Sequence, residues 1–349
     1  SAKLEKNAMN SMKAVVVQNK SLRIAEVPRP VPGPYQCLVK TLFAATCNAT
    51  DRMFLDTSAE APRILGHESV GRVVEPGARV RNFRAGDLVL RPTAVYPGET
   101  LAGMTAGLGG FSEYGLVTDI AAAEADGVAL PGGVAGYSRF QQKLPPELDP
   151  KDATMLITLK ETLSWARRAG AASGKGVLIF GDGPVGQCFA KVCKLLGASP
   201  VIVVGHWPQR LERATALGAD RVINRKATPV SEACARQRLA DVVIDAVGDY
   251  TLMDEGLSVL RERGTYTVYG LTKKKDVAFS MTRGPREWDL RFFKMDEAET
   301  HEEVLARVRN GELELKTLYD CVLPMEKAGE AMERLARREA NKVVLEMGG

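Results

Sequence analysis

The chain has 349 residues, enough for two domains of ordinary size, which excludes a single small module. Its 47 basic and 43 acidic side chains leave a formal net charge of +4 without a long basic run, so neither nucleic acid nor a membrane is expected as the main partner. Hydrophobic residues make up 45% and charged residues 26% of the chain, which excludes a disordered or fibrous protein.

The six cysteines are scattered and contain no CxxC pair, so they do not form the pattern of a disulfide framework. No run approaches the roughly 18 apolar residues that span a bilayer, and residues 1–11 lack the apolar stretch of a signal peptide. We therefore expect a cytoplasmic protein. Residues 1–11 precede the first strand pattern, which begins at Met12, and are left out of the fold prediction.

The first part of the chain, from Met12 to about Val117, predicts a largely antiparallel β domain. Short β-branched or alternating runs are separated there by Gly and Pro, at residues 14–17, 22–27, 37–42, 70–75, 87–90 and 111–117. The four prolines of residues 28–34 exclude a central strand and indicate an extended connector. Residues 119–143 carry no sustained period, which fits a mobile loop that lines a site, a short helix with a loop, or a surface insertion.

From Asp152 on, the pattern changes to buried strands that alternate with helices. Strands are expected at residues 176–180, 200–204, 221–223, 241–246 and 265–269, with helices at 153–169, 185–196, 208–217 and 252–260. Continuous apolar strands between helices indicate a parallel sheet covered on both faces, in a doubly wound Rossmann domain. Helices at 296–308 and 326–338 and a strand at 342–346 follow, and this tail is expected to return to the first domain.

A glycine motif, GDGPVG, lies between a predicted buried strand and a predicted helix and matches GxGxxG. Gly181 permits the tight turn, Gly183 lets a pyrophosphate approach the backbone, and Gly186 allows close packing. The phosphates would lie at the N-terminus of the helix that begins with Pro184 and Val185. The motif therefore predicts a dinucleotide site.

The residue that ends the second strand of this domain predicts which dinucleotide is preferred. An acid there usually binds the adenosine ribose of NAD, but this strand ends in Gly205 and His206. A glycine does not repel a 2′-phosphate, and His206 and Arg210 offer positive charge. We therefore expect NADP(H) to be preferred over NAD(H). The alternative is that His206 and Arg210 are ordinary solvated residues.

Two residue types with metal affinity occur in the first part of the chain. Cys47 lies on a polar loop, TCNATD, 20 residues before His67, which Glu68 follows. A thiolate and an imidazole are suitable zinc ligands. Their spacing alone proves nothing, and the default interpretation is a buried free cysteine and a core histidine.

The motifs taken in order resemble those of the medium-chain dehydrogenase/reductase superfamily, in its zinc-dependent alcohol and polyol dehydrogenase branch. They are GHESVGRV at 66–73, GDLV at 86–89, GFSEY at 110–114, GDGPVG at 181–186, RLERATALGAD at 210–220, DVVIDAVG at 241–248 and KVVL at 342–345. The resemblance extends from Met12 to the C-terminus.

This resemblance implies a GroES-like catalytic domain over residues 12–151 and 296–349 and a Rossmann cofactor domain over 152–295. It implies one catalytic zinc bound by Cys47 and His67, with Glu68 close to the metal or on it. It also implies that the hydroxyl of Thr50 relays the substrate proton, and that the cofactor contacts Val247 and Gly270. A homodimer or homotetramer is implied as well, which would cover the apolar edge strand near residues 291–293.

The sequence departs from this family in three ways. The loop after Cys47 has one extra residue before Thr50, which would displace the relay hydroxyl from its position in the family. Residues 87–143 contain no cysteine, so a structural four-cysteine zinc site is not expected. The third zinc ligand of the family should lie at residues 156–158, where no credible ligand occurs; the nearest candidates, Lys160 and Glu161, lie about one helical turn further on.

The sequence therefore predicts an NADP-linked, zinc-dependent oxidoreductase that interconverts a secondary alcohol, polyol or sugar with its carbonyl. Glu161 or Glu68 would complete the zinc ligands, or Lys160 would supply positive charge in place of the metal. The first alternative is a zinc-free reductase of the same superfamily that acts on quinones or activated alkenes. The second is a nucleotide-binding protein without turnover.

Overall fold

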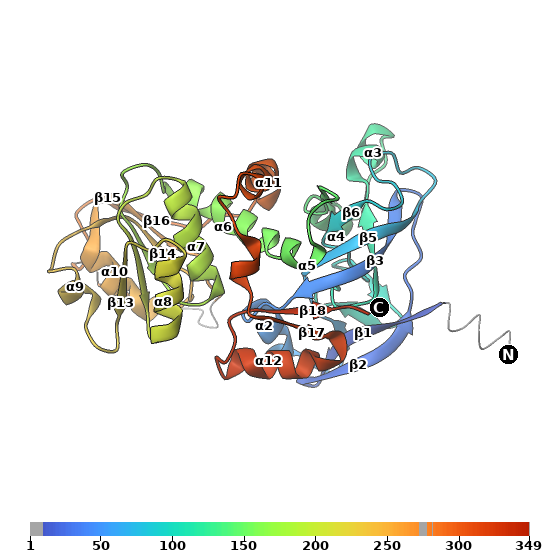
Figure 1. Cartoon of the computed structure of the whole chain (residues 1–349), viewed down its shortest axis with the longest axis horizontal. Coiled ribbons are helices and arrows are strands. Elements are labelled where there is room, and N and C mark those ends of the chain that lie inside the picture. Colours follow the sequence, from blue (N-terminus) through green and yellow to red (C-terminus); the bar gives the residue numbers. More distant parts are fainter. Residues whose placement is uncertain (1–9, 272–277, 281, 349) are drawn as a thin grey trace. The chain divides into compact units, whose positions relative to one another are not determined.

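The computed structural model describes residues 10–271, 278–280 and 282–348, and the chain divides into two compact units (Figure 1). The first unit comprises Ser1–Ile157 and Leu315–Gly349, and the second comprises Thr158–Glu314. Residues 152–157 thus lie in the first unit and residues 296–314 in the second, unlike in the predicted division.

Contacts within the second unit explain why residues 296–314 belong to it. The Thr300 hydroxyl donates to the Lys160 carbonyl at 3.0 Å, and the Glu299 carboxylate accepts from Ser164 and pairs with Arg168. These bonds join the segment to a helix of the second unit. Helical periodicity alone showed that a helix follows residue 296, but it contained no information about the helix's partners.

The described residues of the first unit form two sheets. One has the order β2-β1-β4-β8-β7; the other has the order β10-β6-β5-β3-β18-β17, with β9 also paired to β3. The strands are β1 (Ser11–Gln18), β2 (Ser21–Pro28), β3 (Gln36–Ala45), β4 (Arg63–Ile64), β5 (Glu68–Pro76), β6 (Leu88–Leu90), β7 (Thr100–Leu101), β8 (Met104–Ala106), β9 (Tyr114–Thr118), β10 (Lys143–Leu144), β17 (Cys321–Pro324) and β18 (Val343–Glu346). Most pairs are antiparallel, as predicted.

Strand β3 organises the second of these sheets, because it pairs with β5, with β9 and with β18 from the end of the chain. The inward side chains of β18, Val343 and Leu345, pack with Val15, Val17 and Phe111 in one apolar cluster. Burial of these side chains fixes the register, since a shift by one residue would turn them toward solvent. The tail therefore returns to the first unit, as predicted.

The helices of the first unit are short. They are α2 (Thr50–Thr57), α3 (Ile120–Ala125), α4 (Gly132–Ser138), α5 (Pro150–Ala153) and α12 (Ala328–Ala336), with 3-10 turns η3 (Leu315–Leu318) and η4 (Met325–Lys327). Residues 119–143 thus form two short helices rather than one loop. The Asp119 carboxylate caps α3 by accepting from Ala122, and Tyr137 of α4 packs edge-on against Tyr96.

The second unit is built on one parallel sheet with the order β13-β12-β11-β14-β15-β16. The strands are β11 (Val177–Phe180), β12 (Val201–Gly205), β13 (Arg221–Asn224), β14 (Ala240–Asp245), β15 (Leu260–Val268) and β16 (Trp288–Arg291). The order reverses between β11 and β14. Ligands of doubly wound folds bind at such a switch point, beyond the carboxyl ends of the strands.

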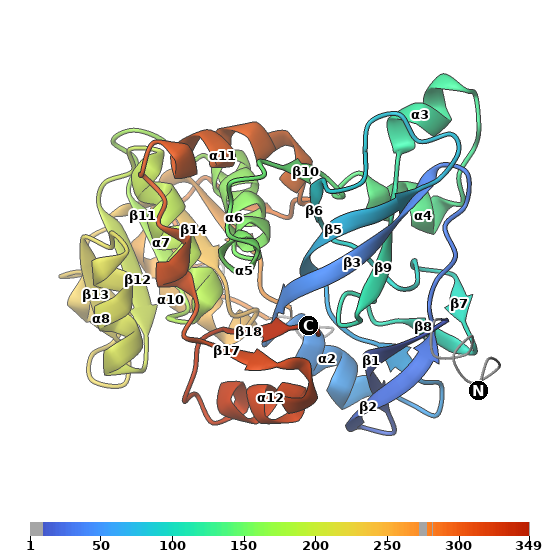
Figure 2. The ribbon, with the colours of Figure 1, turned by 45° about the vertical axis from the view of Figure 1, so that its right-hand side comes forward.

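The helices of this unit alternate with its strands, as predicted (Figure 2). They are α6 (Leu156–Ala169), which begins at the end of the first unit, α7 (Pro184–Leu195), α8 (Pro208–Ala216), α9 (Val230–Ala233), α10 (Met253–Val259) and α11 (His301–Arg309), with η1 (Tyr250–Leu252) and η2 (Glu297–Thr300). The predicted helix 153–169 was wrong at its start, because the chain forms the separate helix α5 before α6.

The core of the second unit contains the apolar strand residues that the sequence pattern singled out. Phe180, Val204 and Val243 pack against Leu257 of α10 on one face of the sheet. Among the described residues, no helix has the length and apolar character needed to cross a membrane.

Candidate metal and cofactor sites

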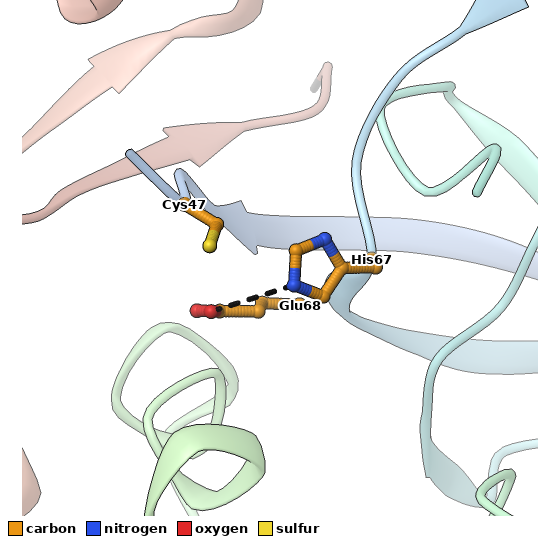
Figure 3. Close-up of side chains that lie close together, drawn as sticks. All are labelled: Cys47, His67 and Glu68. Carbon is orange, nitrogen blue, oxygen red and sulfur yellow. Dashed lines mark ion pairs between the residues drawn. The ribbon is translucent and has the colours of Figure 1, made fainter. Parts of the chain in front are cut away.

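The first candidate site is a group of three possible metal ligands in the first unit (Figure 3). Cys47 follows β3, and Glu68 begins β5 directly after His67. Because Ala45 pairs with Glu68 between these antiparallel strands, the end of β3 lies beside the start of β5. The ligand atoms of Cys47, His67 and Glu68 consequently all lie within 4.8 Å of one another.

Nearby charges act on the His67 ring. Its Nδ1 atom lies 3.7 Å from Oδ1 of Asp51, and its Nε2 atom lies 3.7 Å from Oε1 of Glu68. Burial lowers the pKa of His67, but Asp51 and the Cys47 sulfur outweigh burial and raise that pKa well above its ordinary value. A metal needs the neutral imidazole, so metal binding would release a proton here.

The backbone around the GHE motif explains why a glycine precedes the histidine. Gly66 has a φ of +92°, and a Cβ atom there would lie 2.1 Å from the ring of Phe111. The His67 carbonyl accepts a hydrogen bond from Nη1 of Arg91 at 2.9 Å. The chain is therefore held on both sides of the imidazole, which limits the positions that His67 can take.

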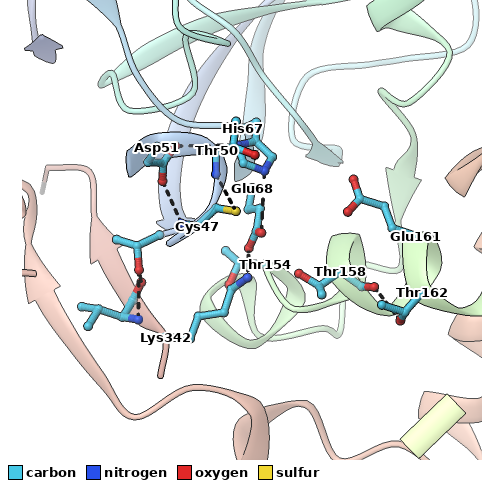
Figure 4. Close-up of polar contacts among 12 residues, drawn as sticks. Cys47, Thr50, Asp51, His67, Glu68, Thr154, Thr158, Glu161, Thr162 and Lys342 are labelled. Carbon is cyan, nitrogen blue, oxygen red and sulfur yellow. Dashed lines mark hydrogen bonds and ion pairs between the residues drawn. The ribbon is translucent and has the colours of Figure 1, made fainter. Parts of the chain in front are cut away.

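Residues near Cys47 are tied to it by local hydrogen bonds. The Cys47 amide donates to Oδ2 of Asp51 at 2.7 Å, and the Thr50 amide donates to the Cys47 sulfur at 3.5 Å. Thr50 thus lies beside the possible metal ligand despite the extra residue in the loop (Figure 4). The relay role of its hydroxyl stays a prediction.

A lysine from the end of the chain joins this group. The Lys342 ammonium forms an ion pair with Oε2 of Glu68, and both side chains are almost fully buried (Figure 4). Sequence reasoning missed this residue. The KVVL motif that Lys342 opens was recognised, but nothing in it indicates a contact with a residue 274 positions away (342 − 68).

The two substitutes suggested for the third family ligand have other neighbours, which lie in the second unit. Oε2 of Glu161 accepts a hydrogen bond from the Tyr269 hydroxyl at 3.0 Å. The Lys160 ammonium is buried 3.5 Å from Nδ1 of His301 and 3.9 Å from Oε2 of Glu297. Glu161 is not part of the metal-capable group found among the described residues, and its ligand role stays a prediction.

The second candidate site is the glycine loop of the second unit. Gly181 has a φ of +119°, and Gly183 precedes α7 as its N-cap residue. A Cβ atom on Gly186 would lie 1.8 Å from the Gly181 carbonyl oxygen, so close packing requires this glycine. A Cβ atom on Gly183 would meet nothing within 4 Å, which leaves its backbone open to a pyrophosphate.

The ends of β14 and β15 approach the same glycine loop. A Cβ atom on Gly181 would lie 3.2 Å from Val247, and one on Gly270 would lie 2.2 Å from the Val247 backbone. The structure therefore brings together three predicted cofactor-binding residues. Beside them, burial raises the pKa of Asp245 to about 6, although its Oδ1 accepts hydrogen bonds from Val247 and Gly248.

A carboxylate that sequence reasoning missed lies next to Gly205. Oδ2 of Asp182, within the glycine motif, accepts from the amides of His206 and Trp207 at 2.7 and 2.8 Å. A Cβ atom on Gly205 would lie 2.4 Å from both Cβ and Oδ2 of Asp182. Strand β12 thus ends without an acid of its own, but the Asp182 carboxylate of the glycine loop lies beside its last residue.

Positive charge surrounds the same turn. The Lys226 ammonium lies 4.6 Å from the centre of the Trp207 ring. Arg210 lies in the first turn of α8, where its carbonyl accepts from Gln187 at 3.5 Å. His206 and Arg210 are therefore on the turn that was predicted to face the adenosine ribose, and their contact with a 2′-phosphate stays a prediction.

Comparisons with known proteins agree with this fold. Residues 33–126 match the alcohol dehydrogenase GroES-like domain, and residues 184–306 match the zinc-binding dehydrogenase model. L-threonine 3-dehydrogenase of Pyrococcus horikoshii is 30% identical over 71% of this chain and 72% of its own. Sorbitol dehydrogenase of Gallus gallus is 27% identical over 95% of both chains. The solved alcohol dehydrogenase of Thermus sp. ATN1 is 26% identical, with a TM-score of 0.79 over 96% of this chain and 99% of its own.

The fold and the comparisons define an oxidoreductase with a GroES-like domain and a Rossmann-like parallel sheet. The chain belongs to the alcohol and polyol dehydrogenase branch of the medium-chain dehydrogenase/reductase superfamily and is an alcohol dehydrogenase-like enzyme. The family, the fold class and the enzyme class predicted from sequence are confirmed.

Proposed function

We propose that the protein interconverts a secondary alcohol, polyol or sugar with its carbonyl by hydride exchange with a nicotinamide cofactor. The observation that supports this most strongly is the metal-capable group of Cys47, His67 and Glu68 in the GroES-like unit. The sorbitol and threonine dehydrogenases among the relatives support a hydroxyl substrate.

The three side chains fit a catalytic zinc. Thiolate, imidazole and carboxylate are all zinc ligands, and catalytic sites use three protein ligands with one open position. When bound, zinc would polarise the substrate oxygen and stabilise an alkoxide. Cys47 would bind as thiolate and His67 as neutral imidazole, while the Thr50 hydroxyl would carry the substrate proton away. Glu68 would complete the ligand set.

We propose one catalytic zinc and no structural zinc. The family's structural site needs a four-cysteine cluster, and residues 87–143 contain no cysteine. All six cysteines are free, which also supports a reducing, cytoplasmic location.

We propose NADP(H) as the preferred cofactor. The support is the absence of a side chain at Gly205 together with the nearby cations Arg210 and Lys226 and the His206 imidazole, which can donate a hydrogen bond. The Asp182 carboxylate opposes this preference, but two backbone amides compensate part of its charge. Fluorescence titration with NADPH and NADH tests the proposal, and tighter NADH binding would contradict it.

We propose that the protein forms a homodimer or homotetramer. Strand β16 ends the parallel sheet of the second unit, and Leu290 and the following Phe292 are 38% and 61% exposed. An exposed apolar sheet edge favours pairing with another copy. Light scattering at micromolar concentration should give a multiple of the chain mass.

A zinc-free reductase of quinones or activated alkenes is the second candidate. Residues 156–158 offer no credible third ligand at the family's usual position, which supports this alternative. The decisive experiment combines metal analysis of protein purified without chelator with turnover on a panel of alcohols, carbonyls, quinones and alkenes. Zinc near one per chain and alcohol oxidation that stops on chelation support the main proposal. Full activity after exhaustive chelation supports the reductase.

A further inference from the structure

Lys342 is the feature of the candidate metal site that the proposed zinc chemistry does not use. Its ammonium group pairs with Oε2 of Glu68, and the two side chains are 5% and 3% exposed. The other carboxylate oxygen, Oε1, lies 3.7 Å from Nε2 of His67. One oxygen of Glu68 therefore points to the lysine and the other to the possible metal ligands.

The fold places Lys342 there through strand register. Ala45 of β3 pairs with Glu68 of β5 on one side and with Val344 of β18 on the other. Hydrogen bonds lock the entry to β18: the Thr46 hydroxyl donates to the Val343 carbonyl at 3.0 Å and accepts from the Val343 amide at 3.1 Å. The position of Lys342 is thus set by the sheet rather than by its own flexible side chain.

A second anchor holds the backbone of Lys342 itself. Oδ2 of Asp320 accepts from the amides of Asn341 and Lys342 at 2.6 and 2.9 Å. The lysine stem is buried and its backbone is bonded on both sides, so little conformational entropy is lost when the ammonium meets Glu68. An ion pair held in this way contributes more to stability than most exposed pairs, which are worth little.

The charges of the site show what the pair does. Zn²⁺ with the Cys47 thiolate, the Glu68 carboxylate and a neutral His67 sums to zero. Asp51 and Lys342 add one negative and one positive charge, which also cancel. Without the metal, Lys342 compensates the buried Glu68 carboxylate, which would otherwise be strongly destabilising. With the metal, the same ammonium repels the zinc ion across the carboxylate.

We propose that Lys342 is a built-in counter-ion that competes with the metal for Glu68. It stabilises the site without metal and weakens zinc binding, and it leaves Oε1 as the oxygen through which Glu68 binds. This inference rests on the proposed zinc function. Lys342 acts through Glu68 and is a positioning residue rather than a catalytic one.

The test measures zinc affinity and stability rather than turnover. Lys342→Met keeps the length of the buried stem and removes the charge. We expect its thermal midpoint without metal to fall, its zinc dissociation constant from chelator competition to fall at least tenfold, and its midpoint with saturating zinc to recover. Lys342→Arg should leave the zinc dissociation constant within about threefold of the native value.

Two controls assign the effect to the pair with Glu68. Lys327→Met removes an exposed lysine of the same unit, 3.5 Å from Glu330, and should leave zinc affinity unchanged. In a Glu68→Gln background, Lys342→Met should lose most of its effect on zinc affinity, because the shared carboxylate charge is already absent. The double variant also keeps the test valid if Lys342→Met alone folds poorly, because Glu68→Gln removes the buried carboxylate that Lys342→Met leaves without a counter-ion.

The outcomes separate this inference from the proposed function. Native protein that binds no zinc overturns both. Native protein that binds zinc, with Lys342→Met binding it equally or more weakly, overturns the inference alone. An unchanged effect of Lys342→Met in the Glu68→Gln background also overturns it, because the lysine would then act independently of Glu68.

Discussion

Replacing Gly205 would show whether Asp182 has taken the space where a side chain at the end of β12 would lie. The new Cβ atom of Gly205→Ala would lie 2.4 Å from Cβ and Oδ2 of Asp182. Overpacking of this kind costs about 1–3 kcal/mol. Gly205→Asp adds a second carboxylate, and two unit charges 4 Å apart repel by about 4 kcal/mol at an effective dielectric constant of 20. We expect Gly205→Asp to lower the free energy of unfolding by about 5–7 kcal/mol.

Urea unfolding measures these changes, and the double variant Gly205→Asp/Asp182→Ala should recover part of the loss. Gly183→Ala is the matched control, because its Cβ atom meets nothing within 4 Å, and it should stay within about 0.5 kcal/mol of native. The double variant should also bind NADH better relative to NADPH, since the acid is then free to reach the ribose. Native stability of Gly205→Ala, or a double variant no more stable than Gly205→Asp, would refute this reasoning.

Three further predictions concern a candidate metal ligand and two buried charged groups. Cys47→Ser should lose both bound zinc and alcohol oxidation while keeping the fold by circular dichroism, and retained turnover would contradict a role of Cys47 in the metal site. Burial raises the pKa of Asp245 to about 6, so the charged carboxylate destabilises the folded protein above that pH, and this cost disappears toward pH 4. Asp245→Asn should therefore raise the free energy of unfolding at pH 8 by up to about 3 kcal/mol and should give no gain near pH 4. Lys160→Met should cost about 3–5 kcal/mol because it leaves Glu297 buried without its ammonium, and Lys160→Met/Glu297→Gln should recover most of that loss.

Local patterns in the sequence were sufficient for the framework of the second unit and for part of each site. The glycine motif follows a run of four buried apolar residues, β11, and opens a helix, so strand, turn and helix could be recognised together. Patterns of this kind involve residues that are adjacent in the chain, so they can be recognised from the sequence alone. Cys47 and His67 were proposed as zinc ligands from their residue types together with the family motifs around them, because their spacing alone also fits a purely structural role.

The shortest elements of the first unit could not be predicted. Strands β4 and β10 have two residues each, too few to show an alternation, and they exist only because a longer strand lies beside them. The break between α5 and α6 is likewise absent from the apolar period. The backbone hydrogen bonds of the two strands are made with segments far away in the sequence.

Only the tertiary structure decided which charged side chains interact with which partners. Lys342 reaches Glu68 through the register of three strands, Asp182 reaches the amides after Gly205 across a turn, and Lys160 is buried against Glu297 from a later helix. None of these pairs has a fixed sequence separation, because each depends on how two elements pack. The sequence by itself therefore determined the fold class and the residue types of the sites, while packing determined the partners that set their charge.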